Sequence, residues 1–191
     1  MQVIPTRLSG VVILEPVVFS DARGCFSEVW SQRVFDASVR PVRFVQDNES
    51  RSVYGVVRGL HYQKGVHSQG NLIRVVQGRV RVVAVDLRRG SPTFGEWVAV
   101  ELSGENHRQL FVPRGFAHGF SVLSEEAVFQ YKCDNYYAPG EEAGIAWDDP
   151  DLAIDWGIPA KAVLLSGKDR RNPRLSQAQD LFDYGVDYYA F

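Results

Sequence analysis

Hydrophobic residues in this chain gather in short runs at regular spacing, and polar or turn-forming residues separate the runs. Valine, isoleucine, phenylalanine and tyrosine dominate the runs, whereas glycine, proline, serine, aspartate and asparagine stand between them. The runs that fit a strand are Val11–Phe19, Arg43–Asp47, Gly55–His61, Leu72–Gln77, Arg79–Leu87, Glu96–Leu102, Gln109–Val112, Gly119–Leu123 and Val128–Cys133. Many short strands at such spacing predict an all-β fold, an antiparallel sandwich or barrel.

Helical periodicity is weak, so we expect only a few short peripheral helices. Ser31–Ser38 predicts one or two helical turns with Ser31 as the cap, and Ser176–Phe182 predicts another short helix. From Asp148 onward, Asp-Pro, Gly-Ile-Pro and Asn-Pro predict a loop that wraps the core. The closing LFDYGVDYYAF is too aromatic for solvent, so we expect it to dock on the core or on a second subunit. No linker divides the chain, which predicts a single domain over residues 1–191.

The two runs around Gly78 predict a β-hairpin, because Gln77-Gly78 suits a two-residue turn. That turn places Ile73 opposite Val82 and Asn71 opposite Ala84. Side chains alternate along a strand, so Asn71 and Val82 would be diagonal neighbours on one face.

Composition describes an ordinary globular protein of 191 residues, with 45% hydrophobic and 23% charged residues. The 21 basic and 23 acidic residues leave a net charge of −2, which gives no indication of binding to nucleic acid or a membrane surface. No apolar run approaches the roughly 20 residues of a membrane span, and the N-terminal segment lacks signal-peptide features. A cytoplasmic protein is therefore expected. Cys25 and Cys133 are expected to be free thiols.

Two histidines lie beside apolar runs, in GLHYQ at His61 and in GFAHGF at His118. A lone histidine in such a setting is more often a hydrogen-bonded core residue. Two of them together with Arg58, Gln63 and Tyr131 favour a polar pocket, because buried polar groups are unfavourable unless paired.

Pro113–His118 has the form P-x-G-x-x-H, which resembles the second motif of the cupin superfamily. Metal cupins add an H-x-H motif, but here only His61 is found in the corresponding region. A divalent metal needs three or four ligands close together, so a metal cupin oxygenase is disfavoured and no metal is expected. His67 and His107 lie in polar segments and are expected on the surface.

The pocket residues also suit acid–base chemistry. Histidine is the natural base near neutral pH, and Asp169 at the end of an apolar stretch could orient it, although a turn carboxylate is an equal alternative. Tyr131 offers a phenol, and Arg23 and Arg58 are candidate anion ligands because a guanidinium donates parallel hydrogen bonds.

Several ordered motifs between about residues 3 and 187 carry a family resemblance. They are Asp21–Glu28, Val45–Ser50, Gly55–Gln63, Ser91–Gly95, Pro113–Phe120, Tyr131-Lys132 and Leu165–Asp169. Together they resemble the dTDP-4-dehydrorhamnose 3,5-epimerases. The resemblance implies a cupin-type jelly roll without metal or other cofactor, and a homodimer whose subunits exchange strands. It also implies epimerisation of dTDP-4-keto-6-deoxy-D-glucose at C3 and C5, in dTDP-L-rhamnose biosynthesis.

The resemblance also assigns roles to residues. His61 would be the base, Asp169 its partner, and Tyr131 the acid on the opposite face of the sugar. The remaining assignments are nucleotide and diphosphate contacts for Arg23, Glu28, Gln46, Asn48, Arg58, Glu142 and Lys168, thymine contacts for Phe26 and Tyr137, and a sugar contact for His118.

Two positions depart from the family pattern: Asn71 stands where a lysine is usual, and Val82 where an aspartate is usual. The lysine is the cation expected near the C4 oxygen, and Asn71 could donate a neutral hydrogen bond instead. Three interpretations stay open: a slower or retuned 3,5-epimerase, an enzyme that epimerises one carbon or another nucleotide 4-keto-sugar, or an engineered variant. We favour the first because the base, its partner and the acid are retained. A non-catalytic nucleotide-sugar binding protein is the alternative of another class, but binding alone needs no base–acid pair.

Overall fold

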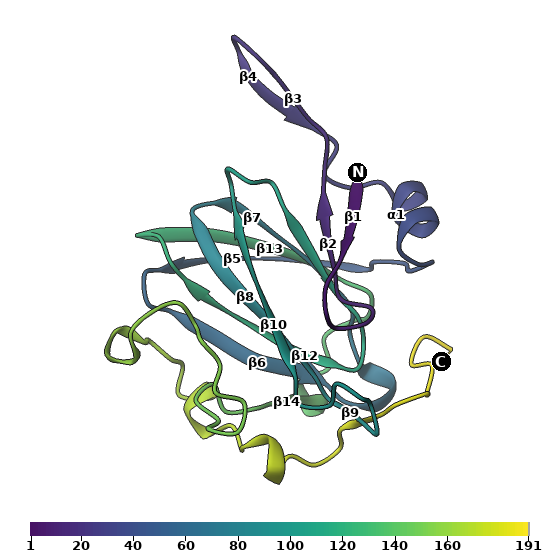
Figure 1. The fold of residues 1–191 in the computed structure, drawn as a ribbon, viewed down its shortest axis with the longest axis vertical. Coiled ribbons are helices and arrows are strands. Elements are labelled where there is room, and N and C mark those ends of the chain that lie inside the picture. The colour runs from purple at the N-terminus through teal and green to yellow at the C-terminus, as the bar shows by residue number, and fades with distance from the viewer. Residues whose placement is uncertain (191) are drawn as a thin grey trace.

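The computed structural model describes residues 1–190 as two antiparallel sheets that face each other (Figure 1). The six-stranded sheet has the order β1 (Gln2–Pro5), β2 (Val12–Glu15), β11 (Gln109–Val112), β7 (Asn71–Gln77), β13 (Glu126–Cys133) and β5 (Gln46–Val53). The five-stranded sheet has the order β10 (Trp97–Ser103), β8 (Arg79–Asp86), β12 (Phe116–Val122), β6 (Val57–Gln63) and β14 (Glu142–Gly144). The predicted all-β sandwich is confirmed.

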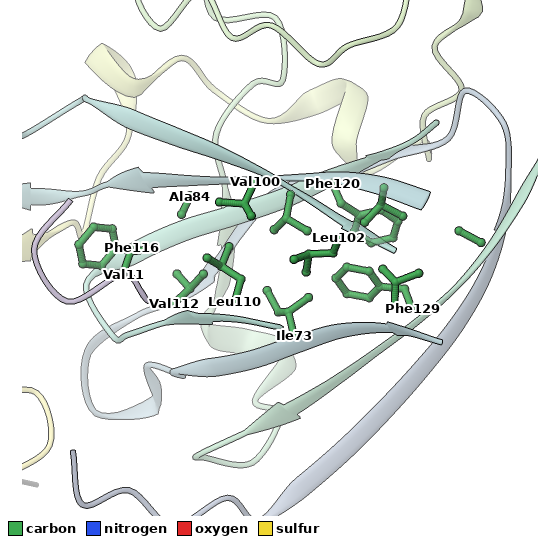
Figure 2. Close-up of a cluster of buried hydrophobic side chains, with 14 of the residues drawn as sticks. Val11, Ile73, Ala84, Val100, Leu102, Leu110, Val112, Phe116, Phe120 and Phe129 are labelled. Carbon is green, nitrogen blue, oxygen red and sulfur yellow. The ribbon is translucent and has the colours of Figure 1, made fainter. Parts of the chain in front are cut away.

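An apolar core fills the space between the two sheets. Figure 2 shows Ile73, Phe120 and Phe129 pointing into this space from different strands. Phe120 and Phe129 stack across it with ring centroids 4.0 Å apart. Because inward positions recur at every second residue, Asn71 and Tyr131 occupy the inward positions next to Ile73 and Phe129. The interior thus changes from apolar to polar along β7 and β13.

The predicted hairpin around Gly78 is wrong. β7 pairs with β11 and β13, whereas β8 pairs with β10 and β12 in the other sheet. Gly78 has φ of +77°, and a Cβ there would lie 2.0 Å from the Glu126 carbonyl oxygen, so glycine permits a tight crossing between the layers. Both strands carry apolar inward faces, and these are buried better across the sandwich than side by side. Asn71 and Val82 therefore belong to opposite sheets, and Val82 is fully buried in the apolar core.

The C-terminal segment covers the outer face of the five-stranded sheet, as the loop prediction from Asp148 onward implied (Figure 1). Phe182, which is 2% exposed, packs edge-on against Tyr62, so the aromatic close docks on the core. The predicted helix over Ser176–Phe182 is wrong: Leu175–Gln177 forms one 3₁₀ turn, and Phe182 belongs to β15 (Phe182–Asp183), which pairs with β9 (Arg88–Arg89). The other 3₁₀ turns are Gly65–His67, Pro139–Glu141, Ala160–Ala162 and Asp169–Arg171. Phe191 lies outside the described residues.

The helix α1 (Gln32–Ser38) covers part of the outer face of the six-stranded sheet. It begins where predicted, although the Ser31 side chain makes no capping hydrogen bond. Its buried Phe35 packs against Phe111 with centroids 5.1 Å apart. Beside it, β3 (Val18–Asp21) and β4 (Gly24–Ser27) form a hairpin that projects from the rest of the molecule (Figure 1).

Candidate active site

Three ring side chains meet between the sheets: His61 on β6, His118 on β12 and Tyr131 on β13. His61 and His118 are direct cross-strand partners, and Tyr131 comes from the facing sheet. The rings of His118 and Tyr131 lie with centroids 6.4 Å apart at an angle of 67°. All three line a cavity of about 480 Å³, together with Arg58 and Asp169. The structure therefore brings these five residues together around one cavity, whereas Gln63 of the predicted pocket lines the adjoining recess.

An irregularity in β6 turns both Arg58 and His61 toward this cavity. In a regular strand, residues three apart point to opposite faces. Here His61 pairs with His118 while Arg58 pairs with Phe120, so β6 holds one extra residue between the two pairs. Gly59 lies in that bulge with φ of +125°, and a Cβ there would lie 2.5 Å from the backbone of β12. Only glycine permits this close approach, so the local sequence determines where the base and the arginine point.

His61 and Asp169 form a hydrogen-bonded pair, with His61 Nε2 2.5 Å from Asp169 Oδ1. Asp169 is 4% exposed, and its backbone N–H donates to Ser166 Oγ at 3.0 Å. Burial raises the pKa of Asp169, but the hydrogen bond and charge of His61 and the contact with Ser166 outweigh it, so the pKa falls below its ordinary value. The ionised carboxylate holds the proton of His61 on Nε2, which leaves Nδ1 free to accept one.

Tyr131 stands on the wall opposite His61. Burial raises the pKa of its phenol above the ordinary value, and the nearby Cys133 raises this pKa further. Tyr131 therefore keeps its proton at neutral pH and can donate it. The site thus holds a proton acceptor on one sheet and a proton donor on the other.

His118 fills the wall between them as a neutral ring. Burial between the sheets lowers its pKa to about 4, and repulsion from a charged His61 adds to the shift. At neutral pH it is a polar, uncharged neighbour of His61 and Tyr131.

Arg58 lies at the exposed mouth of the cavity. Its Nε and Nη2 atoms both donate to the Oγ atom of buried Ser52, at 3.2 and 3.1 Å. This contact orients the guanidinium while the residue stays exposed, which suits an anionic group of a ligand.

Glu142 links two further predicted binding residues. Its carboxylate accepts a hydrogen bond from the Tyr137 hydroxyl at 2.5 Å and forms an ion pair with Lys168. Burial raises the pKa of Glu142, but the hydrogen bonds from Lys168 and Tyr137 prevail and lower it. β14 carries Glu142 and pairs with β6, where Gly144 is the partner of His61. The sheet therefore places this cluster beside the base.

Gln46, Asn48 and Asn71 form a polar layer within the sandwich. Gln46 Nε2 donates to Asn48 Oδ1 at 3.1 Å on β5. Asn71 is 4% exposed and lines a narrow recess of about 110 Å³ that it shares with His61 and Tyr131. Asn71 therefore lies next to the predicted catalytic residues, and Asn48 is the cross-strand partner of Tyr131. Gln46 is paired with Cys133 instead and lines neither the cavity nor the recess.

Arg23, Phe26 and Glu28 are not brought to the cavity within one subunit. Arg23 forms an ion pair with Asp21 at 2.6 Å, and Phe26 is 70% exposed. Both belong to the β3–β4 hairpin, which projects away from the sandwich (Figure 1). Glu28 follows the hairpin and is exposed.

Sequence reasoning missed Ser52 and Ser166, which hold Arg58 and Asp169 in place. Ser52 shares its strand face with Asn48, so alternation along β5 was a usable signal. Ser166 lies inside the Leu165–Asp169 motif but carries no distinctive chemistry.

Among residues 1–190, no group of three or more His, Cys, Asp or Glu side chains is placed to hold a metal ion. Within the same range, no helix has the length and apolar character needed to cross a membrane.

The profile of the dTDP-4-dehydrorhamnose 3,5-epimerase family matches residues 5–177. The chain belongs to this family. It is 55% identical to the dTDP-4-dehydrorhamnose 3,5-epimerase of Shigella flexneri over 170 residues. The matched region covers 88% of this chain and 93% of the relative. The predicted family and the predicted isomerase class are confirmed.

Two solved structures of epimerases share the fold. The Legionella pneumophila dTDP-6-deoxy-D-glucose-3,5-epimerase, in complex with dTDP-4-keto-L-rhamnose, has a TM-score of 0.93 and 47% identity over 97% of this chain and 99% of that one. A 3'-monoepimerase from Streptomyces bikiniensis, in complex with dTDP-quinovose, has a TM-score of 0.88 and 32% identity over 95% of this chain and 93% of that one. The predicted cupin-type jelly roll is thereby confirmed.

Proposed function

We propose that this epimerase inverts C3 and C5 of dTDP-4-keto-6-deoxy-D-glucose to form dTDP-4-keto-L-rhamnose, in the cytoplasmic synthesis of dTDP-L-rhamnose. One observation carries the proposal: His61, held by Asp169, and Tyr131 stand on facing sheets across one cavity. The C3 and C5 protons are both adjacent to the C4 ketone, so removal of either gives an enolate with its charge on the C4 oxygen. Inversion then needs a proton from the other face.

Each inversion moves two protons. His61 Nδ1 takes the proton from carbon, the electron pair passes to the C4 oxygen, and the Tyr131 hydroxyl returns a proton to the opposite face. His61 then holds one proton too many and Tyr131 one too few, so both must exchange with solvent before the second carbon reacts. Water accessible in the open cavity serves this exchange, and the bound ketone needs no redox step.

Anionic parts of the substrate fit the outer residues. We assign the diphosphate to Arg58 and Lys168, because both cations lie at the cavity mouth. Tyr137 and Glu142, which line the recess, are assigned to the nucleotide, and His118 to the sugar. Gln46 and Asn48 are assigned to the nucleotide as well, because Gln46 accepts a hydrogen bond from the Tyr137 backbone and donates one to Asn48. The Legionella pneumophila relative binds dTDP-4-keto-L-rhamnose in its solved structure, which supports a dTDP-sugar as ligand here.

The proposal includes a homodimer in which each hairpin completes the partner's site. The β3–β4 hairpin projects from its own subunit and exposes Phe19 by 64% and Phe26 by 70%. Exposed aromatic residues on a projecting hairpin favour contact with another chain. Strand β5 is the outermost strand at one side of the six-stranded sheet, and it lies beside the cavity. An open sheet edge of this kind can accept a further strand. Arg23, Phe26 and Glu28 would then reach the nucleotide.

A second candidate, inversion of one carbon only, is favoured by Asn71. A neutral amide in the recess stabilises an enolate less than a cation would. A 32% identical relative of the same fold is a 3'-monoepimerase.

Incubation with dTDP-4-keto-6-deoxyglucose in D₂O, followed by NMR, tests the proposal. We expect deuterium at C3 and C5 of an inverted product, loss of both signals in His61→Ala, and no loss in His67→Ala, whose side chain is exposed. Deuterium at C3 alone would identify a mono-epimerase. No deuterium in the unmodified protein would exclude epimerase activity.

A further inference from the structure

A buried thiol lies between two amides of the site. Cys133 ends β13 and is fully buried. Its cross-strand partners are Gln46 on β5 and Asn71 on β7. The thiol is thus enclosed by polar side chains from both neighbouring strands.

Cys133 takes part in two hydrogen bonds of opposite direction. Asn48 Nδ2 donates to Cys133 Sγ at 3.4 Å, and Cys133 Sγ donates to Asn71 Oδ1 at 3.3 Å. Burial, with a smaller effect of the neighbouring Asp134, raises the pKa of the thiol to about 12. Cys133 therefore keeps its proton at neutral pH and remains a donor.

These contacts belong to a longer series of hydrogen bonds in which every donor points the same way along the series. The Tyr137 backbone N–H donates to Gln46 Oε1 at 3.0 Å, and Gln46 Nε2 donates to Asn48 Oδ1 at 3.1 Å. Beyond Cys133, Asn71 Nδ2 donates to the Gln69 carbonyl oxygen at 3.4 Å. This hydrogen-bond series connects the proposed nucleotide contacts with the recess beside His61.

The direction of this hydrogen-bond series determines whether Asn71 presents its amide oxygen or its amide nitrogen to the recess. Its Oδ1 atom is occupied by the thiol, so its amide nitrogen is turned the other way. That nitrogen carries two protons, of which one is directed to Gln69. The second is left for the recess, which Asn71 lines together with His61, His118 and Tyr131.

We infer that Cys133 is a positioning residue, which holds the Asn71 amide so that its N–H points to the C4 oxygen of the substrate. The inference rests on the proposed function. Charge on that oxygen appears only as the enolate forms, so a well-oriented donor stabilises the transition state more than the bound ketone. Without the thiol, the amide can rotate and present Oδ1 instead, which would repel the developing negative charge.

The expected effect lies in kcat. Removal of a whole donor to a developing oxyanion typically lowers kcat by about 10²–10³. Misorientation of a donor that is still present should be milder, and we expect Cys133→Ala to lower kcat by roughly three- to tenfold with KM little changed. Cys133→Ser keeps a donor and should stay close to the unmodified enzyme. Cys133→Val, which fills the space without a donor, should behave as Cys133→Ala and replaces it if the alanine variant does not fold.

A double-mutant cycle separates positioning from packing. The variants are Cys133→Ala, Asn71→Ala and the double variant, each assayed by deuterium incorporation from D₂O after thermal melting has shown that it is folded. If Cys133 acts through Asn71, Cys133→Ala causes no further loss of kcat in the Asn71→Ala background. A packing defect would instead lower kcat by the same factor in both backgrounds.

The outcomes are distinguishable. Unchanged kcat in both Cys133→Ala and Cys133→Val, or additive losses in the cycle, would overturn the inference while the unmodified protein still exchanges both protons. An equal loss in Cys133→Ser and Cys133→Ala would also overturn it, because the donor would not matter. No exchange in the unmodified protein would overturn the proposed function and this inference together.

Discussion

His61 Nε2 lies 2.5 Å from Asp169 Oδ1, although 108 positions separate the two residues in the chain. Asp169→Asn keeps the size of the side chain but removes the charge that holds the proton on Nε2. We expect the rate of proton exchange to fall by about 10²–10⁴, the usual contribution of general acid–base catalysis. Initial rates of deuterium incorporation measure this loss. Asp148→Asn, at an exposed carboxylate, is the matched control, and equal rates in the two variants would refute the role of the pair.

Tyr131→Phe should separate proton removal from inversion. The ring remains, so packing against Phe129 and His118 is kept, but no hydroxyl is left to protonate the far face. We expect deuterium to enter with retained configuration, because His61 can return a proton to the face from which it took one. NMR coupling constants of the recovered sugar distinguish the two configurations. Tyr54→Phe, at a 44% exposed tyrosine, should give normal inversion.

Exchange of hairpins predicts complementation between inactive subunits. In a mixed dimer of Arg23→Ala and His61→Ala, one site has both its own histidine and an intact partner hairpin. Co-expression at equal levels should restore about one quarter of normal activity, since half of the dimers are mixed and each has one complete site. Steady-state rates of the purified mixture measure this. Co-expression of His61→Ala with Asp169→Asn should stay inactive, because both changes affect residues of the same subunit's site. Failure of the first pair to recover activity would count against the exchanged dimer.

His118 predicts a dependence of stability on pH. Its pKa in the folded state is about 4, below the ordinary 6.5, so the unfolded chain takes up a proton first as the pH falls. His118 therefore contributes stability that is complete above about pH 6.5 and is lost as the pH falls toward 4. His118→Asn should lose less of its free energy of unfolding between pH 7 and 4.5 than the unmodified protein. Urea denaturation at both pH values tests this, with exposed His67→Asn as the control.

Asp86 makes a second contribution, in a lower pH range. It is fully buried, which raises its pKa, but hydrogen bonds from Arg88, Thr93 and Ser91 prevail and lower it. Its stabilising effect is present above about pH 4 and is lost as the pH falls further. Asp86→Asn should reduce the free energy of unfolding at pH 7 by about 1–3 kcal/mol. The difference from the unmodified protein should shrink by pH 3, and a constant difference would contradict the assignment.

The family, the all-β fold and the central strands of both sheets were predictable from the sequence. The predicted strand Arg43–Asp47 overlaps β5 (Gln46–Val53) only at its end, and the single run Val11–Phe19 is divided between β2 and β3. Runs such as Gln109–Val112 match strands of the structure, because strand propensity and turn residues act locally. The identities of His61, Asp169 and Tyr131 were also predictable, since their motifs are intact. Their catalytic and binding roles remain proposals.

Strand partners were not predictable in the same way. Adjacent apolar runs around Gly78 suggested a hairpin, yet β7 and β8 entered different sheets. Backbone hydrogen bonds are alike for every pair of strands, so local pattern does not select the partner. Burial of both inward faces selects it, and this depends on the whole chain.

The amino-acid sequence by itself determined which segments are extended, where glycine allows a bulge or a tight crossing, and which side chains can accept or donate a proton. Only the tertiary structure decided that β6 and β13 face each other, so that His61 and Tyr131 stand on opposite walls. It also decided that Cys133 lies between Asn48 and Asn71. The physical reason is that side-chain type and backbone preference are local properties, whereas distances across a sandwich follow from burial shared by strands far apart in the chain.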